Sequence, residues 1–183
     1  MSYDLSVPIC DRAMFHADNS YYLPHIKITS YRCKTNTVSN TAFRGFGGPQ
    51  GMLGMERVID EIAHYLGKDP IEVRRANFYD PPGKGGFRSV TPYGMNVEDC
   101  VIEDIVTELR DNSEYDERRA NIRAWNRNSS TLKRGIALTP VKFGISFTLT
   151  FLNQAGALVH VYNDGSIHLN HGGTEMGQGL FTK

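Results

Sequence analysis

The sequence has few cysteines and no surplus of charge of either sign. Its 183 residues include three cysteines, Cys10, Cys33 and Cys100, which are widely spaced and form no C-x-x-C pair. A zinc ribbon or an iron–sulfur ligand set is therefore not supported. Twenty basic residues balance twenty acidic ones, so net charge gives no reason to expect a nucleic acid or a membrane as partner. The thiols favour a reducing, cytoplasmic setting.

Long hydrophobic runs and several common catalytic motifs are also missing. The first nine residues show no basic patch followed by an apolar run, and we expect neither a signal peptide nor a transmembrane span. There is no G-x-S-x-G, no Walker loop and no Rossmann fingerprint after a strand. The glycines of residues 172–179 follow a strand pattern, but their spacing does not fit dinucleotide binding.

Helical periodicity is the clearest structural signal in the first half of the chain. Apolar residues recur at helical spacing over residues 52–66, and a glycine follows as a C-terminal stop. An Asp-Pro pair then predicts the N-cap and first position of a second helix over residues 70–77. We expect its arginines, Arg74 and Arg75, to be solvated.

Strand patterns lie on either side of these helices. Short apolar and aromatic runs, broken by turn residues, predict strands and turns in residues 6–34, where 26–32 alternate like a half-buried strand. Near the C-terminus, residues 157–162 and 167–170 flank an Asn-Asp-Gly-Ser turn, which predicts a β-hairpin.

A segment rich in proline and glycine predicts a linker at 81–96. Helical patterns follow at 97–109 and 115–126. The mixture shows no βαβ alternation, so we expect an α+β fold. The linker would divide the chain into subregions 1–80 and 97–183.

The glycine-rich stretch 40–50 is the most informative part of the chain. Gly45, Gly47 and Gly48 leave too little side chain for a packed strand or helix, and they suit a backbone that must approach a ligand closely. An ordinary turn between a strand and a helix explains the same glycines. The guanidinium of Arg44 suits a phosphate, pterin or oxo ligand, or it bonds carbonyls of its own loop.

Three stretches resemble the xanthine dehydrogenase/oxidase branch of the molybdenum hydroxylases. They are Asn40–Gln50, Lys142–Thr148 and His171–Leu180, in the same order as in that family. The resemblance covers essentially the whole chain but only part of the family's molybdenum domain. It implies that 1–80 is part of a first molybdopterin-binding subdomain and that 97–183 begins a second.

The resemblance also implies the reaction and its cofactors. Such enzymes hydroxylate hypoxanthine and xanthine to urate at a molybdenum–molybdopterin centre, in some cases with the pterin as a dinucleotide. Electrons then pass to 2Fe-2S clusters, FAD and NAD on other domains or subunits of an oligomer. This is the xanthine dehydrogenase class of oxidoreductase, EC 1.17.1.4.

Cofactor contacts are implied for both glycine-rich loops. In the resembled family, the arginine matching Arg44 lies beside the molybdenum cofactor, largely through its backbone, with Phe43 and Gly45 as its neighbours. Arg44 is therefore the residue expected next to the metal. A glutamine matching Gln178 lies near the pterin.

Substrate contacts are implied for two phenylalanines and a threonine. Phe46 and Phe147 match the pair that flanks a flat substrate, one at its edge and one on its face. Thr148 matches a threonine that hydrogen-bonds the substrate. From the residues alone, both phenylalanines would be core anchors and Thr148 a strand threonine.

Arg12 distinguishes between substrate classes. From the sequence alone, a surface ion pair with Asp11 or Asp18 would be favoured. In the xanthine-type enzymes the matching arginine binds a substrate oxygen and stabilises negative charge on the purine, whereas aldehyde oxidases typically lack it. Arg12 therefore favours oxopurines over aldehydes.

No catalytic base is expected in these residues. The family's essential glutamate comes from a later segment, and Glu175 is interpreted as structural. His160 and His168 lie on opposite arms of the predicted hairpin and could pair. We therefore expect a fragment that does not turn over xanthine by itself. The alternatives are an inactive scaffold, an aldehyde oxidase-type hydroxylase, or a nucleotide-binding module.

Overall fold

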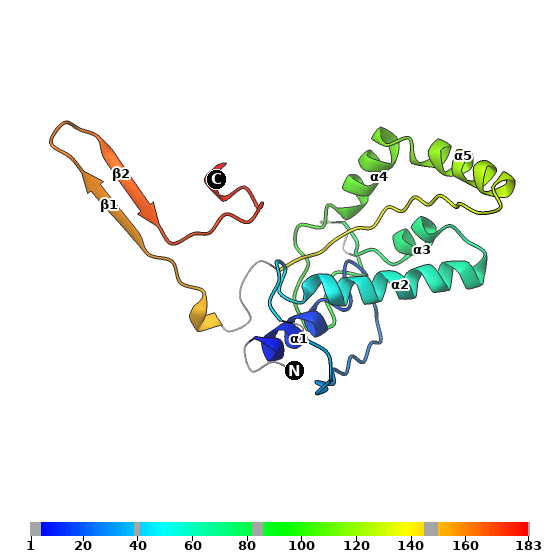
Figure 1. The fold of residues 1–183 in the computed structure, drawn as a ribbon, viewed down its shortest axis with the longest axis horizontal. Coiled ribbons are helices and arrows are strands. Elements are labelled where there is room, and N and C mark those ends of the chain that lie inside the picture. The colour runs from blue at the N-terminus through cyan, green and yellow to red at the C-terminus, as the bar shows by residue number, and fades with distance from the viewer. Residues whose placement is uncertain (1–4, 39–40, 82–85, 145–149, 183) are drawn as a thin grey trace. The chain divides into compact units, whose positions relative to one another are not determined.

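The structure, a computed structural model, describes residues 5–38, 41–81, 86–144 and 150–182. Contacts within the chain divide it into two units, Met1–Phe143 and Gly144–Lys183. The first unit contains the described helices α1 (Ser6–Phe15), α2 (Gly48–Leu66), α3 (Pro70–Ala76), α4 (Ile102–Asn112) and α5 (Tyr115–Asn128) (Figure 1). The second contains β1 (Ala157–Val161), β2 (Ile167–His171) and two 3-10 turns, Thr150–Leu152 and Leu180–Thr182. This mixture confirms the α+β prediction.

The core of the first unit joins residues from both sides of the predicted linker. Tyr21 and Phe78 form an isolated antiparallel bridge, and their rings stack with centroids 6.2 Å apart. Val106 and Leu138 pack into the same buried cluster. Segment 81–96 therefore does not separate two structural units of this chain, since the apolar side chains that follow it complete the core before it. As a division between subdomains of the family, it stays a prediction.

The α2–α3 pair forms as its sequence predicts. The left-handed residue Gly67, with φ of 63°, ends α2, and the amide of Lys68 reaches back to the carbonyl of Ala63 at 2.9 Å. Asp69 caps α3 by accepting a hydrogen bond from the amide of Ile71 at 3.1 Å. A short turn thus folds α3 back along α2.

Two predictions for the N-terminal segment are wrong. Helix α1 occupies residues 6–15, where strands were expected, and its buried residues Ser6, Ile9 and Arg12 recur every third position. Residues 26–32 form no strand ladder among the described residues, and all but the first are exposed. Alternation alone cannot make a strand, because a strand also needs a hydrogen-bonded neighbour.

Arg74 is buried, contrary to the prediction that it is solvated. Its side chain is 1% exposed, and it binds Glu56 and Asp60 of α2 with N–O distances of 2.8 Å each. Burial acts to lower the pKa of Arg74, but the Glu56 carboxylate outweighs that effect and raises it. Arg75 stays partly exposed and pairs with Glu103. The turn between α2 and α3 brings Arg74 opposite the acidic face of α2, which composition does not reveal.

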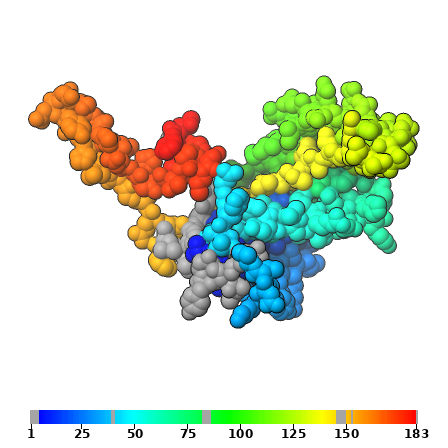
Figure 2. Space-filling view, in the orientation of Figure 1, coloured from blue at the N-terminus to red at the C-terminus, as the bar shows by residue number. Residues whose placement is uncertain are grey.

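Helix α5 was predicted over 115–126 and is present, whereas α4 begins later than predicted. Residues 96–97 pair with Ser89 and Val90 instead of starting the helix. The predicted hairpin is confirmed, with His160 directly opposite His168. Every residue of both strands is exposed, and Figure 2 shows the hairpin in orange in a space-filling view. None of the described helices combines the length and apolarity that crossing a membrane requires.

Candidate functional site

The first glycine-rich stretch forms a tight turn that leads into α2. The amide of Phe46 donates to the carbonyl of Phe43 at 2.8 Å, and the amide of Gly48 donates to the carbonyl of Gly45 at 3.0 Å. Gly45 has φ of 90° and Phe46 has φ of 50°, both in the left-handed region. Phe43 and Arg44 lie on the exposed side of the turn, and Phe46 is half-buried. The turn therefore presents an aromatic ring and a guanidinium outward.

Two glycines of this region approach the backbone of α1. A Cβ atom on Gly47 would come within 3.0 Å of the carbonyl oxygen of Ile9, and a Cβ atom on Gly51 would come equally close to the carbonyl oxygen of Ala13. Glycine at these positions lets the start of α2 lie directly on α1. The close backbone approach that the sequence suggested is thus made, at these two positions, to the protein itself.

Arg12 is buried, not in the surface ion pair favoured by the sequence alone. It is 5% exposed, and its Cζ lies 4.9 Å from the ring centroid of Phe143. The two candidate partners have other contacts: Asp11 pairs with Arg32, and Asp18 binds Lys142. Burial lowers the pKa of the Arg12 guanidinium, which nevertheless stays charged.

Phe143 connects the first glycine-rich stretch to α1. Its ring centroid lies 5.0 Å from that of His16, and a Cβ on Gly48 would stand 2.5 Å from its Cε2. Burial is also the main cause that lowers the pKa of His16. Sequence reasoning did not single out Phe143, although it lies within the stretch 142–148 that resembles the family. Its contacts bring Arg12, predicted to bind substrate, beside the turn predicted to bind cofactor.

A polar network holds the segment before Phe143 against the turn that follows α1. Lys142 Nζ donates to Asp18 Oδ2 at 2.8 Å, and Asn19 Nδ2 donates to the carbonyl of Pro140 at 3.0 Å and to Glu56 Oε1 at 2.8 Å. Burial acts to lower the pKa of Lys142, but the hydrogen bond and charge of Asp18 outweigh it and raise the pKa. Asn19, with φ of 47°, lies at the turn expected from the sequence, but its bonds to Glu56 and Pro140 were missed because these partners are distant in the chain.

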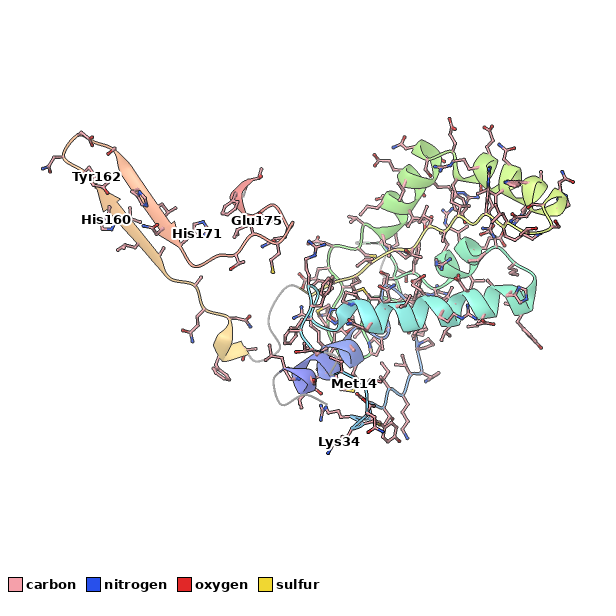
Figure 3. All side chains as sticks on the ribbon, viewed as in Figure 1. Met14, Lys34, His160, Tyr162, His171 and Glu175 are labelled. Carbon is pink, nitrogen blue, oxygen red and sulfur yellow. The ribbon has the colours of Figure 1, made fainter. Side chains whose placement is uncertain are left out.

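The polar side chains of the second glycine-rich loop, which carries Glu175 (Figure 3), bond backbone groups of the same loop. Glu175 accepts hydrogen bonds from the amides of Gly177 at 2.6 Å and Gly179 at 3.2 Å, and these bonds lower its pKa. Gln178 accepts from the amide of Met176 at 2.6 Å and donates to the carbonyl of Thr174 at 2.7 Å. The geometry agrees with a structural role for Glu175. The cofactor role of Gln178 stays a prediction, since both ends of its amide are bonded within the loop.

Two predicted substrate residues, Phe147 and Thr148, lie outside the described residues. In the second unit, the rings of His160 and His168 lie across the hairpin with centroids 6.5 Å apart at 76°, and both residues are exposed. No group of three or more histidine, cysteine or acidic side chains suited to a metal ion occurs in the described part of the chain.

The first turn fits a cofactor that is held by hydrogen bonds rather than by protein ligands to its metal. A guanidinium offers five donors, and Arg44 presents one on the exposed side of a turn in which Gly45 and Phe46 have left-handed φ angles. An anionic, pterin-bearing group can accept such bonds.

Comparison with known proteins identifies the chain's class. A family model of the molybdopterin cofactor-binding domain matches residues 1–78, and a second model with the same description matches residues 108–183. The chain is 51% identical over 182 residues to the xanthine dehydrogenase/oxidase of Mus musculus. It is 48% identical over the same length to the xanthine dehydrogenases of Calliphora vicina and Dictyostelium discoideum. Each match covers the whole chain but 13% of the relative's length.

A solved structure agrees at the level of the fold. The aldehyde oxidoreductase of Desulfovibrio gigas superimposes with a TM-score of 0.52 over 89% of this chain and 16% of that protein, at 21% identity. The chain therefore consists of molybdopterin cofactor-binding domain sequence. Along its whole length it is also similar to part of xanthine dehydrogenases, which confirms the resemblance found in its three stretches.

Proposed function

We propose that this chain forms part of the cofactor and substrate walls of a molybdenum hydroxylase that oxidises hypoxanthine and xanthine to urate. The observation that carries the proposal is the identity of 47–51% with xanthine dehydrogenases over its full length. Arg12 and Gly48, which follows the turn of Arg44, both contact the ring of Phe143. This supports the proposal, since a substrate and a cofactor must meet in one site. A cytoplasmic setting and membership of an oligomer are part of the same proposal.

The cofactor in this proposal is molybdenum bound to molybdopterin. When bound, it supplies the oxygen-transfer and redox chemistry. In the first unit, the chain would hold it through the turn Phe43–Gly45, where Arg44 offers donors to an anionic group. A contact from Gln178 is implied only by the resemblance to the family. Iron–sulfur clusters and FAD on other domains would carry the electrons away.

Arg12 would act on the substrate side. A charged donor in a buried position stabilises negative charge far better than one in water, because the local dielectric is low. Its contact with an oxygen of an oxopurine would orient the ring and favour purines over aldehydes. Phe46 would lie on the same side, the substrate contacts of Phe147 and Thr148 are implied only by the resemblance to the family, and the general base would come from another segment.

A segment exchange tests the proposal. This chain would replace the matching part of the mouse enzyme, and xanthine turnover and molybdenum content would both be measured. We expect turnover with normal molybdenum content. In the exchanged enzyme, Arg12→Lys should lower kcat/KM for xanthine by about tenfold or more, since a hydrogen bond to a charged group contributes about 1.5–3 kcal/mol.

Three other outcomes would contradict it. Normal molybdenum content without turnover of any substrate would indicate an inactive scaffold. Turnover of aldehydes but not xanthine would indicate the aldehyde-type activity. An unchanged kcat/KM in Arg12→Lys would remove Arg12 from the substrate site.

A further inference from the structure

Phe143 is contacted by side chains or backbone from two helices. The guanidinium of Arg12 lies over its ring at 4.9 Å, and the ring of His16 lies 5.0 Å away, tilted by 37°. The start of α2 reaches it at Gly48, where a Cβ would stand 2.5 Å from the ring. The ring therefore occupies the place where α1 meets the beginning of α2.

The contact with Arg12 has the character of a cation–π interaction. A cation over an aromatic face gains about 0.5–1 kcal/mol when exposed and about 2 kcal/mol or more when desolvated. Arg12 is 5% exposed but Phe143 is 38% exposed, so the contact lies between these two cases. A guanidinium donates hydrogen bonds in its own plane, so a ring over its face orients the side chain without taking up its N–H groups.

The segment that carries the Phe143 ring is bonded to the turn that follows α1. Lys142, the preceding residue, binds Asp18 through its side chain, and its amide reaches Asn19 Oδ1 at 3.4 Å. Asn19 also bonds the carbonyl of Pro140. Phe143 and Arg12 therefore share one frame, so the distance between them does not depend on a flexible segment.

Glycine at position 48 is explained by this ring. The atoms that a Cβ would meet there all belong to the Phe143 side chain, not to backbone. A methyl group would therefore move the ring away from its place beside Arg12, while the helix itself could continue. Gly48 leaves the space that the ring occupies.

We propose that Phe143 is a positioning residue that orients the Arg12 guanidinium toward the substrate. The proposal rests on the proposed function, in which Arg12 contacts a substrate oxygen. Phe143 does not touch the reacting atoms in this role. It sets the rotamer of Arg12, and Gly48 provides the room for it to do so.

The first test is spectroscopic and needs no cofactor. In the 183-residue chain, the Arg12 Nε–Hε NMR signal should be shifted by the ring current of Phe143. We expect Phe143→Tyr to keep this shift, and Phe143→Leu and Gly48→Ala to lose it. Phe87→Leu is the matched control, because Phe87 is 82% exposed, is distant from Arg12 in the sequence and makes its ring contact with Tyr22. An unshifted wild-type signal, or equal spectra for the Tyr and Leu variants, would overturn the proposal.

The second test is kinetic, in the exchanged mouse enzyme. Phe143→Leu should lower kcat/KM for xanthine about tenfold, equivalent to about 1.4 kcal/mol, with molybdenum content and turnover of a simple aldehyde unchanged. Phe143→Tyr should restore xanthine turnover. In an Arg12→Lys background, Phe143→Leu should have little further effect, because the two residues act through one interaction.

The outcomes separate this inference from the function on which it rests. If Arg12→Lys impairs xanthine turnover but Phe143→Leu does not, or if the two effects simply add, the positioning role is wrong and the function stands. If Phe143→Leu impairs xanthine and aldehyde equally, Phe143 serves packing only. If Arg12→Lys has no effect on xanthine, the proposed function of Arg12 fails, while the NMR result still decides whether Phe143 orients it.

Discussion

Two glycines three residues apart in α2, Gly51 against α1 and Gly54 facing solvent, should respond in opposite directions to alanine. Both lie in the helix interior, where alanine is intrinsically better than glycine by about 1 kcal/mol. A Cβ on Gly54 would meet nothing within 4 Å, whereas one on Gly51 would meet three backbone atoms of Ala13. The pair therefore separates helix propensity from the docking of α1 on α2.

The magnitudes follow from that geometry. Gly54→Ala should raise the free energy of unfolding by about 0.5–1 kcal/mol, because it only restricts the unfolded chain. Gly51→Ala gains the same amount but must displace the α1 backbone, and overpacking of this kind costs about 1–3 kcal/mol or more. We expect Gly51→Ala to be less stable than Gly54→Ala by that steric cost.

Urea unfolding followed by circular dichroism measures the difference directly. A second readout locates it: Cys10 lies on α1 and is only partly exposed, so its thiol should react faster with a maleimide in Gly51→Ala than in Gly54→Ala. Equal stabilities, or a more stable Gly51→Ala variant, would show that α1 is not docked through Gly51 and would refute the reasoning.

Further predictions concern the charged groups. Arg74→Met should lower the free energy of unfolding by about 3–5 kcal/mol, because it leaves the mostly buried Glu56 carboxylate without its charged partner. Arg57→Ala, at a side chain that is 75% exposed, should lower it by under about 1 kcal/mol. Urea unfolding of both variants measures the difference. Burial, and then the Glu56 carboxylate, raise the pKa of Tyr21 above its ordinary value of 10.0. The folded state therefore keeps that proton longer than the unfolded chain, so stability should fall as pH rises above about 10, and a flat pH profile there would contradict this. Backbone hydrogen bonds lower the pKa of Glu175 below its ordinary value of 4.5. Its loop contacts should therefore persist above that pH and weaken as pH falls below it. The amide NMR shifts of residues 177 and 179 would report this pH dependence, and Glu175→Gln should abolish it.

Local signals in the sequence were reliable where neighbouring residues decide the structure. The periodicity of residues 52–66, the capping pair at Asp69 and the turn at residues 163–166 each predicted an element that is present. These features depend on hydrogen bonds and backbone angles within a few residues, so no distant contact is needed to specify them.

Predictions failed where a distant partner decides the structure. The alternation at 26–32 has no ladder partner among the described residues. Arg74 is buried because the acidic face of α2 lies opposite it. Arg12 was placed at the surface by its neighbours in sequence, yet it is covered by the ring of Phe143.

The sequence by itself determined the family, the glycine-rich turns and the residue types available for cofactor and substrate, since these are matters of residue identity and order. Only the tertiary structure decided that Arg12, Gly48 and Phe143 meet. The physical reason is that glycines at positions 47 and 51 let α2 lie on the backbone of α1. That contact, made between residues far apart in the chain, brings the helix of the predicted substrate arginine against the start of the helix that follows the predicted cofactor turn.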